Sequence, residues 1–291
     1  MHNNTSPHIV FFGTSHVSVV VLEELKKSGF LPQLIVTAPD TKQGRKMVLT
    51  APEAKLWAQE NDIPVLQPEK ITLEVIADIA GRAPQGEWDL FIIAAYGKLL
   101  PKEFLDLPTF EVINVHPSLL PRLRGANPIR GAILADEKEV GVSIMLVDEE
   151  MDHGPVLAQK VIPTQKWPMR GAELDALLAH AGGVLLTETI PQWINGVVTP
   201  QEQKHEDATH TKKVVKEDGL IDLQGDPYQN LLKIRAYEGW PGTYFFKNET
   251  RIKITDAEIK DGALNILRVI PEGKKEMPYA VFMKDANLSQ T

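Results

Sequence analysis

The sequence feature that most constrains the fold is an alternation of short apolar stretches with longer amphipathic stretches across residues 1–190. Short apolar runs are typical of strands, and runs whose apolar residues recur every three or four positions are typical of helices. Regular strand–helix alternation predicts an α/β domain with a mainly parallel sheet, because each helix returns the chain to the starting edge of that sheet. The predicted strands are 8–12, 34–37, 63–66, 89–95, 111–115, 142–147 and 156–162. The predicted helices are 17–27, 52–60, 73–80, 127–135 and 171–193. The sequence leaves open a break in the last helix at Gly182-Gly183 or Pro191.

The chain becomes polar and charged between residues 191 and 210, which indicates a linker. A length of 291 residues suits two domains. Beyond the linker, residues 211–291 contain one helix opened by Asp226-Pro227, a favourable pair at a helix start. Short strands are predicted there at 243–246, 251–255 and 265–270. We therefore expect a small β-rich second domain.

Composition narrows the class of protein. The net charge of −8 disfavours a generic nucleic-acid-binding surface, which is usually basic. The sequence has no cysteine, which excludes disulfides and thiolate chemistry and suits the cytoplasm, where we expect the protein. The N-terminus does not resemble a signal peptide, and no apolar run approaches the ~18 residues of a membrane span, so we expect no membrane association.

The strongest candidate for chemistry is Asn114-Val115-His116, at the end of a predicted strand. Residues two apart on a strand point to the same side, so Asn114 and His116 can reach one common point. Asn supplies a donor for an oxygen that gains charge, and His transfers a proton near neutral pH. Asp152 could orient the imidazole, as carboxylates do for catalytic histidines. The alternatives are that Asn114 and His116 are turn and packing residues and that Asp152-His153-Gly154 is an ordinary β-turn.

Loops near the predicted strand ends are further candidates. In open α/β sheets, ligands bind beyond the carboxyl ends of the strands, where the loops 96–101 and 116–121 lie. Apolar residues in these loops can line a pocket for a flat heterocycle or can simply pack on the core. The loop 39–46 carries three cations, which suits a grip on a polyanion or a solvated surface. The turn Gly13-Thr14-Ser15 lacks the Gly-x-Gly-x-x-Gly pattern of dinucleotide sites.

Taken together, these segments resemble the methionyl-tRNA formyltransferase family over nearly the whole chain. The most specific match is Asn114-Val115-His116, followed by Ser118–Pro121 and Arg124–Ile129. Further matching segments are Gly13–Ser15, Asp40–Leu49, Ala95–Pro101, Met151–Gly154, Lys216–Asp222, Ile234–Ala236, Trp240–Gly242 and Pro271–Met277.

The resemblance implies a Rossmann-like formyl-transfer domain over 1–190, a linker over 191–210 and an OB-like β-barrel over 211–291. This barrel looks shortened, because few residues separate Ile254 from Ile266. The implied reaction transfers the formyl group of 10-formyltetrahydrofolate to the amino group of initiator methionyl-tRNA, without a metal. We also expect a monomer.

The resemblance also assigns roles to residues. Asn114, His116 and Asp152 match the catalytic residues. The residues expected to bind tetrahydrofolate are Tyr96, Leu99, Ser118, Leu119, Leu120 and Pro121. The residues expected to bind tRNA are Lys42, Arg45, Lys46, Lys274 and Lys275.

Two other functions stay open from the sequence. The segment 153–159 also resembles glycinamide ribonucleotide formyltransferase, and sugar-nucleotide N-formyltransferases share the Asn-His-Asp set. The shortened tail and the acidic net charge allow such a small amine acceptor. This acceptor would, however, leave the basic loop 39–46 without a function. A non-catalytic folate- or tRNA-binding protein is the third hypothesis, which an intact set of three candidate catalytic residues disfavours.

Overall fold

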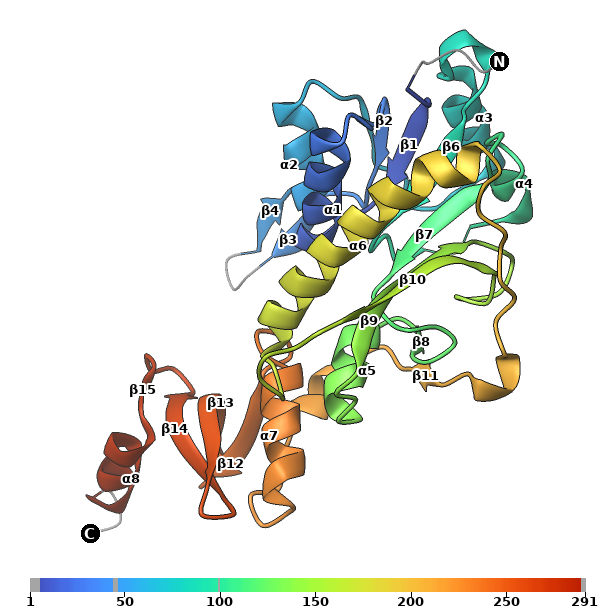
Figure 1. Cartoon of the computed structure of the whole chain (residues 1–291). Helices are drawn as coiled ribbons and strands as arrows, with labels where there is room; N and C mark the ends of the chain where they lie inside the picture. Colours follow the sequence, from blue (N-terminus) through green and yellow to red (C-terminus); the bar gives the residue numbers. More distant parts are fainter. Residues whose placement is uncertain (1–5, 44–46, 99, 289–291) are drawn as a thin grey trace. The chain divides into compact units, whose positions relative to one another are not determined.

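The computed structural model describes residues 6–43, 47–98 and 100–288 (Figure 1). The chain divides into two compact units, which are described separately. The first comprises Met1–Ala126, Val140–Pro163 and Asp175–His210, and the second comprises Asn127–Glu139, Thr164–Leu174 and Thr211–Thr291. Two internal segments of the predicted first domain thus group with the tail, and the predicted linker groups with the first unit. The domain limits at 190 and 210 stay predictions.

The first unit contains a seven-stranded sheet in the order β10-β9-β7-β6-β1-β2-β5. Strands β7, β6, β1, β2 and β5 are mutually parallel, whereas β9 is antiparallel to both of its neighbours. The predicted α/β class with a mainly parallel sheet is confirmed. The strand bounds are β1 Ile9–Phe12, β2 Leu34–Val36, β5 Val65–Leu66, β6 Leu90–Ile93, β7 Val112–His116, β9 Val140–Leu146 and β10 Val156–Ile162.

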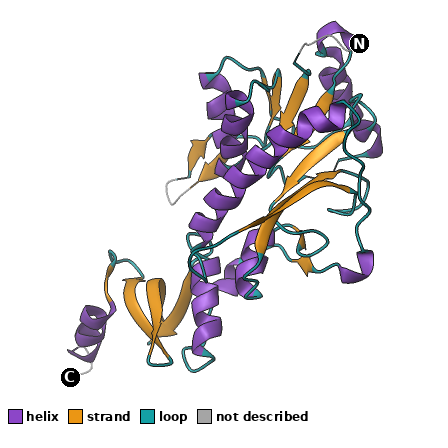
Figure 2. Cartoon of the chain, viewed as in Figure 1, coloured by secondary structure: helices purple, strands orange, loops and turns teal. Residues whose placement is uncertain are grey.

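Helices flank this sheet, as the secondary-structure view shows (Figure 2). Their bounds are α1 His16–Lys27, α2 Glu53–Glu60, α3 Leu73–Gly81, α4 Lys102–Leu105 and α6 Gly171–Ile194. The predicted long helix is confirmed as α6, without the break that the sequence left open at Gly182-Gly183 or Pro191, and the two glycines have a packing role. A Cβ on Gly182 would lie 2.6 Å from Val115 Cγ1, and one on Gly183 would lie 2.9 Å from the Glu24 side chain. The glycine pair therefore lets α6 approach β7 and α1 closely.

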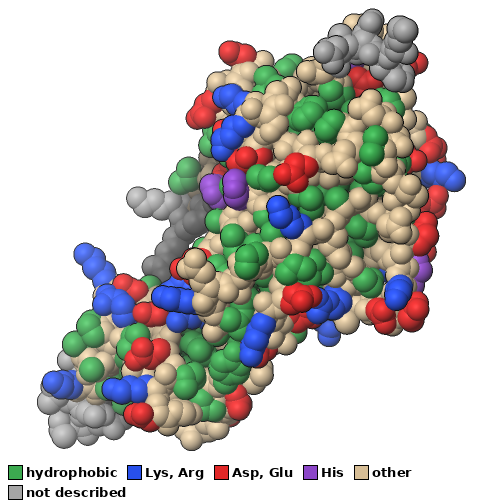
Figure 3. Space-filling view, in the orientation of Figure 1, with side chains coloured by type: hydrophobic (Ala, Val, Ile, Leu, Met, Phe, Trp, Pro, Cys, Tyr) green, Lys and Arg blue, Asp and Glu red, His purple; other side chains and the backbone are tan. Residues whose placement is uncertain are grey.

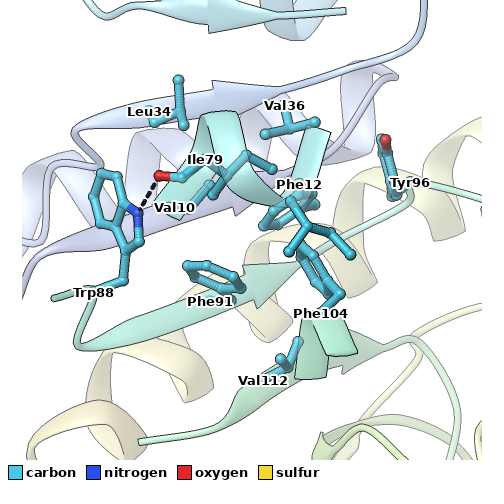
Figure 4. Packing of buried hydrophobic residues seen from close by; sticks show 11 residues of the cluster. Val10, Phe12, Leu34, Val36, Ile79, Trp88, Phe91, Tyr96, Phe104 and Val112 are labelled. Atoms are coloured by element: carbon cyan, nitrogen blue, oxygen red, sulfur yellow. Dashed lines mark hydrogen bonds between the residues drawn. The ribbon is translucent and has the colours of Figure 1, made fainter. Parts of the chain in front are cut away.

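A buried aromatic cluster holds the central strands together on one face of the sheet (Figure 4). Phe12 of β1 meets Phe104 of α4 edge to face, with ring centroids 5.0 Å apart. Trp88 donates a hydrogen bond from Nε1 to Ile79 O at 2.7 Å, which ties α3 to the entry of β6. Each such aromatic pair adds about 0.5–1.5 kcal/mol beyond its buried area. The cluster thereby joins the strands β1, β2, β6 and β7 to the helices α3 and α4.

Two short pairs of strands were not predicted, and neither were α4 and β15 Met277–Pro278. The prediction of a single helix in residues 211–291 is wrong, because α8 Tyr279–Leu288 follows α7 Pro227–Ala236. The basic loop contains an antiparallel pair, β3 Thr41–Gln43 and β4 Val48–Thr50. The segment Arg124–Gly125 forms β8, which pairs with β11, His210–Thr211. The 3-10 turns in the described part of the chain are η1 Pro84–Gly86, η2 His205–Asp207 and η3 Lys216–Gly219.

The second unit contains the predicted small β domain as an antiparallel sheet in the order β12-β13-β14-β15. Its elements are α5 Pro128–Leu134, α7 Pro227–Ala236, β12 Thr243–Lys247, β13 Thr250–Lys260, β14 Ala263–Pro271, β15 Met277–Pro278 and α8 Tyr279–Leu288. The predicted start of α7 is confirmed, since Asp226 Oδ1 accepts from Gln229 N at 2.7 Å. The region that looked shortened is the tip of the β13–β14 hairpin, where Asp261 and Gly262 have φ of 52° and 78°. Positive φ at both positions is typical of a tight type I′ turn.

No helix among the described residues is both long enough and apolar enough to cross a membrane.

Candidate functional site

The candidate site lies where β7 ends, beside the antiparallel strand β9. The register pairs Asn114 with Ile93 of β6 and Met145 of β9, and pairs His116 with Ser143. Strand alternation places Asn114 and His116 on one side, as predicted. Asn114 is half-buried and His116 is buried, so both side chains are positioned by the sheet rather than by mobile backbone.

Asp152 reaches both residues from the loop between β9 and β10. Its Oδ1 accepts from Asn114 Nδ2 at 3.4 Å and lies 3.6 Å from His116 Nδ1. The side chains of His116 and Asp152 are 5% and 15% exposed, so water weakens this pairing little. The three predicted catalytic residues therefore form one cluster, which is the geometry expected of them. Their catalytic roles stay a prediction.

The orientation of the His116 ring follows from its second contact. Nε2 lies 3.1 Å from Leu123 O, inside the protein. A carbonyl oxygen only accepts hydrogen bonds, so Nε2 carries a hydrogen in either charge state. The proton that His116 gains or loses is consequently the one on Nδ1, and Nδ1 faces Asp152. This arrangement suits a group that accepts a proton and holds it beside a carboxylate.

The turn that carries Asp152 is tight because its backbone approaches β9. A Cβ on Gly154 would lie 2.2 Å from Leu146 O, so only glycine fits there. Asp152 itself adopts φ of 52°, a left-handed conformation that non-glycine residues rarely take. Gly125 N donates to Asp152 Oδ2 at 2.7 Å. The second carboxylate oxygen is thereby fixed, and Oδ1 remains directed at Asn114 and His116.

The loop after β7 contains the predicted folate segment, and most of it is packed. Ser118 Oγ donates to Arg122 O at 2.6 Å, and Ser118 O accepts from Ser143 Oγ at 2.7 Å. Leu119 packs on Gly141, where a Cβ would lie 2.4 Å from Leu119 Cδ2. Leu120 and Pro121 border a hollow of about 380 Å³ together with residues 156–159 and 201–204. Within this segment, Leu120 and Pro121 are thus the residues best placed to touch a ligand.

Tyr96 follows β6 at the same carboxyl edge. Burial raises the pKa of Tyr96 to about 12, so the phenol stays a neutral donor. Among the described residues, Oη has no hydrogen-bond partner, and neither do the buried hydroxyl oxygens of Thr14 and Thr37. These residues follow β6, β1 and β2, and buried hydroxyls without partners are uncommon in proteins. Three unused polar groups at the carboxyl edge of the sheet suit a polar, flat ligand.

Lys98 anchors the loop that carries Tyr96. Its Nζ donates to Pro68 O at 2.6 Å and to Glu69 O at 2.9 Å. Burial lowers the pKa of Lys98. The neighbouring candidate Leu99 lies outside the described residues.

The predicted tRNA-binding residues belong to both units. Lys42 is exposed on β3, and Lys274 and Lys275 are exposed between β14 and β15. Arg45 and Lys46 lie outside the described residues. On the face drawn in Figure 3, acidic and basic side chains are interspersed. These lysines are exposed and not packed in the interior. Their role in binding tRNA stays a prediction.

Sequence reasoning missed a set of residues that supports the cluster. Leu123 and Gly125 act through backbone atoms, which carry no side-chain signature. Gln203 is only 6% exposed and lies in the segment that the sequence predicted to be a linker. Its position in a charged, polar stretch gave no sign of burial, because glutamine is common on surfaces.

Comparisons with known proteins agree with this arrangement. Residues 7–189 match the family described as formyl transferase, and residues 213–262 match the formyl transferase C-terminal domain. A methionyl-tRNA formyltransferase of Bacillus licheniformis is 38% identical over 96% of this chain and 95% of its own length. The Bacillus subtilis enzyme of the same name is 37% identical, with the same coverage of both chains.

Solved structures share the fold at lower identity. The methionyl-tRNA formyltransferase of Clostridium thermocellum superposes with a TM-score of 0.60 at 15% identity, covering 94% of this chain and 99% of that one. An N-formyltransferase of Helicobacter canadensis, in complex with folinic acid and dTDP-3-aminofucose, gives 0.63 at 19% identity, covering 88% of each chain.

Proposed function

The chain belongs to the methionyl-tRNA formyltransferase family, and we propose that it transfers the formyl group of 10-formyltetrahydrofolate to the amino group of initiator methionyl-tRNA. The predicted resemblance and the predicted enzyme class, formyl transfer, are confirmed by relatives of 34–38% identity. The observation that carries the proposal is the cluster of Asn114, His116 and Asp152 at the carboxyl edge of the sheet. The expected absence of a metal, the monomeric state and the cytoplasmic location stay predictions.

In the proposed mechanism, the amine of methionyl-tRNA attacks the formyl carbon. Negative charge then develops on the formyl oxygen, and Asn114 Nδ2 and the protonated Nδ1 of His116 stabilise it. Each such donor in a desolvated site lowers the barrier by about 3–4 kcal/mol. Asp152 stabilises the imidazolium form of His116. Asp152 also accepts, directly or through water, the proton that the attacking nitrogen loses, and this proton then passes to the departing folate nitrogen.

Folate fits the carboxyl edge of the first unit. We propose that Tyr96, Leu99, Leu120 and Pro121 contact the folate, and that Ser118 and Leu119 shape the loop from inside. Support comes from the unpartnered Tyr96 hydroxyl and from the structure of the Helicobacter canadensis relative, which was solved with folinic acid. For tRNA, we propose contacts from Lys42, Arg45, Lys46, Lys274 and Lys275, since exposed Lys and Arg supply most phosphate contacts.

A small-molecule acceptor is the less favoured candidate. The sugar N-formyltransferases named among the structural neighbours are at most 20% identical to this chain, and the methionyl-tRNA formyltransferase structure is 15% identical, so these structures indicate the fold and not the acceptor. The relatives named for methionyl-tRNA are 34–38% identical over at least 86% of it. Substrate pockets diverge faster than folds, so the higher identity favours the tRNA acceptor.

The acceptor assay tests the proposal directly. The purified protein is supplied with 10-formyltetrahydrofolate and, in parallel, with initiator methionyl-tRNA, glycinamide ribonucleotide or amino-sugar nucleotides. We expect formylation of methionyl-tRNA with a kcat/KM at least ~100-fold above the others, because only the tRNA engages the basic residues. Efficient formylation of an amino sugar without any of the tRNA would overturn the proposed acceptor. Folate binding without formylation of any acceptor would favour a non-catalytic role.

Replacement of Tyr96 by Phe tests the folate edge. We expect Tyr96→Phe to weaken folinic acid binding about 5–10-fold, the worth of one hydrogen bond of about 1 kcal/mol. Thermal stability should stay equal or rise slightly, because the hydroxyl has no partner among the described residues. Isothermal titration and thermal unfolding measure the two quantities. Tyr228→Phe is the control. It should lose thermal stability and keep folinic acid binding, because the Tyr228 Oη donates to Asp136 Oδ1 at 2.8 Å. Unchanged folinic acid binding in Tyr96→Phe would remove this residue from the proposed folate site.

A further inference from the structure

The three consecutive residues 123–125 supply backbone hydrogen-bond partners for both His116 and Asp152. Leu123 O accepts from His116 Nε2 at 3.1 Å, and Gly125 N donates to Asp152 Oδ2 at 2.7 Å. Arg124 lies between them and is buried, with 5% of its surface exposed. The relative position of the imidazole and the carboxylate therefore depends on where the segment 123–125 lies.

This segment is held in turn by residues 203–209. Leu123 N donates to Thr209 Oγ1 at 2.8 Å, and Arg124 N donates to Thr209 O at 2.9 Å. The guanidinium of Arg124 donates to Gln203 Oε1 from Nε at 3.1 Å and from Nη2 at 2.7 Å. Nη2 also donates to His205 Nδ1 at 2.9 Å. A stretch of sequence that looked like a linker thus anchors the backbone beneath the site.

Gln203 connects this anchor to the turn that carries Asp152. Its Nε2 donates to Asp152 O at 3.0 Å and to Gly154 O at 2.7 Å, while its Oε1 accepts from Arg124. Every polar atom of the amide is used, and Gln203 is buried although residues 201, 202, 204 and 205 are exposed. Asp152 has a φ of 52°, a left-handed backbone conformation that costs energy in a non-glycine residue and that sets the direction of its carbonyl group. The glutamine amide holds that carbonyl in place.

We propose that Gln203 is a positioning residue for formyl transfer, which sets Asp152 against His116 by joining the Asp152 turn to the segment 123–125. The inference rests on the proposed function for its reaction, but the bonds that carry it do not depend on the acceptor. A reacting group that is displaced by about 1 Å can lose on the order of 100-fold in rate while substrate binding persists. The hydrogen bonds of the Gln203 side chain go to Arg124, Asp152 O and Gly154 O, so its effect on Asn114 and His116 passes through Asp152 and Arg124.

The test compares Gln203→Glu with Gln203→Ala and with Gln192→Ala. A glutamate keeps the acceptor oxygens for Arg124 but loses the donor to Asp152 O and Gly154 O. A surface glutamine, Gln192, donates only to Glu188 O of its own helix, at 2.9 Å, and serves as the control. We expect both Gln203 variants to lose about 10–100-fold in kcat with KM for both substrates within about 3-fold of wild type. The Gln192 variant should match wild type.

Amide hydrogen exchange of Gly125 gives a readout that does not depend on turnover. Because Gly125 N donates to Asp152 Oδ2, its exchange should become at least ~10-fold faster in Gln203→Glu, while amides of β1 and β6 stay protected. Wild-type kcat together with wild-type Gly125 exchange would overturn the inference. A fall in kcat accompanied by global loss of protection and of folinic acid binding would overturn it too, because the role would then be structural. If the wild-type protein formylates an amino sugar instead of methionyl-tRNA, the proposed acceptor is wrong. The kcat values of the Gln203 variants are then compared on the amino sugar, and this comparison still tests the positioning role of Gln203.

Discussion

Substitution of His116 by Ala should lower kcat for formylation about 10³-fold while folinic acid binding stays within a few-fold of wild type. The variant removes the imidazole whose Nδ1 lies 3.6 Å from Asp152 Oδ1, and a positioned proton-transfer group contributes about 10²–10⁴-fold. Among the described residues, no hydrogen bond joins His116 to the candidate folate contacts Tyr96 and Leu120. Single-turnover formylation of methionyl-tRNA measures the chemical step, and titration with folinic acid measures donor binding.

Stability must be checked in the same variant, because the Leu123 carbonyl loses its partner. An unsatisfied buried acceptor costs about 1–3 kcal/mol, which a folded domain of this size can tolerate. His180→Ala is the control, since this histidine is exposed and pairs with Glu24 of α1 rather than with a residue of the candidate site. More than a tenth of wild-type kcat in His116→Ala would contradict the proposed role of His116. Loss of folinic acid binding with retained folding would instead place His116 in the donor site.

The sheet was predictable from the sequence because several of its strands, such as β1, β2 and β9, are short runs of largely apolar residues buried throughout. The run 89–95 and its neighbours gave the right elements, and hydrophobic periodicity does not depend on the rest of the fold. The hairpin β3–β4 was missed because its strands are only three residues each and mostly polar, so neither gives an apolar run. The sequence predicted α6 as one long helix but left a break open, because a glycine pair normally weakens a helix. Here the close approach to Val115 and Glu24 compensates for that cost.

The candidate site was predictable only in part. The spacing of Asn114 and His116 placed them on one side of a strand by simple geometry. Asp152 was assigned through the family resemblance, because a separation of 36 residues contains no information about proximity. Gln203 could not be found at all. Its burial depends on Arg124 and on the Asp152 turn, and neither partner is a neighbour of Gln203 in the sequence.

Replacement of Asp152 by Asn should lower kcat on the order of 10³-fold, the scale expected when an amide replaces the carboxylate that orients a catalytic imidazole. The neighbours of the carboxylate explain why an isosteric change is so costly. Gly125 N and Asn114 Nδ2 are both donors, so an amide oxygen can serve only one of them. If it keeps Gly125, the new NH₂ group faces Asn114 and His116 Nδ1. That NH₂ group donates to a bare Nδ1 and so favours the neutral imidazole, which cannot donate to the developing oxyanion.

Asp148→Asn is the matched control for this variant, because Asp148 lies in the same loop and pairs with His153 Nδ1 at 2.6 Å without touching Asn114 or His116. We expect it to lose no more than about 5-fold, in line with the modest effects of substitutions outside the reacting cluster. The decisive comparison is the double variant His116→Ala with Asp152→Asn. Residues that act as a unit are strongly non-additive, so the double variant should be no slower than His116→Ala by more than about 3-fold. Rate losses that multiply to about 10⁶-fold would show that Asp152 and His116 act independently, and the shared handling of one proton would then be wrong.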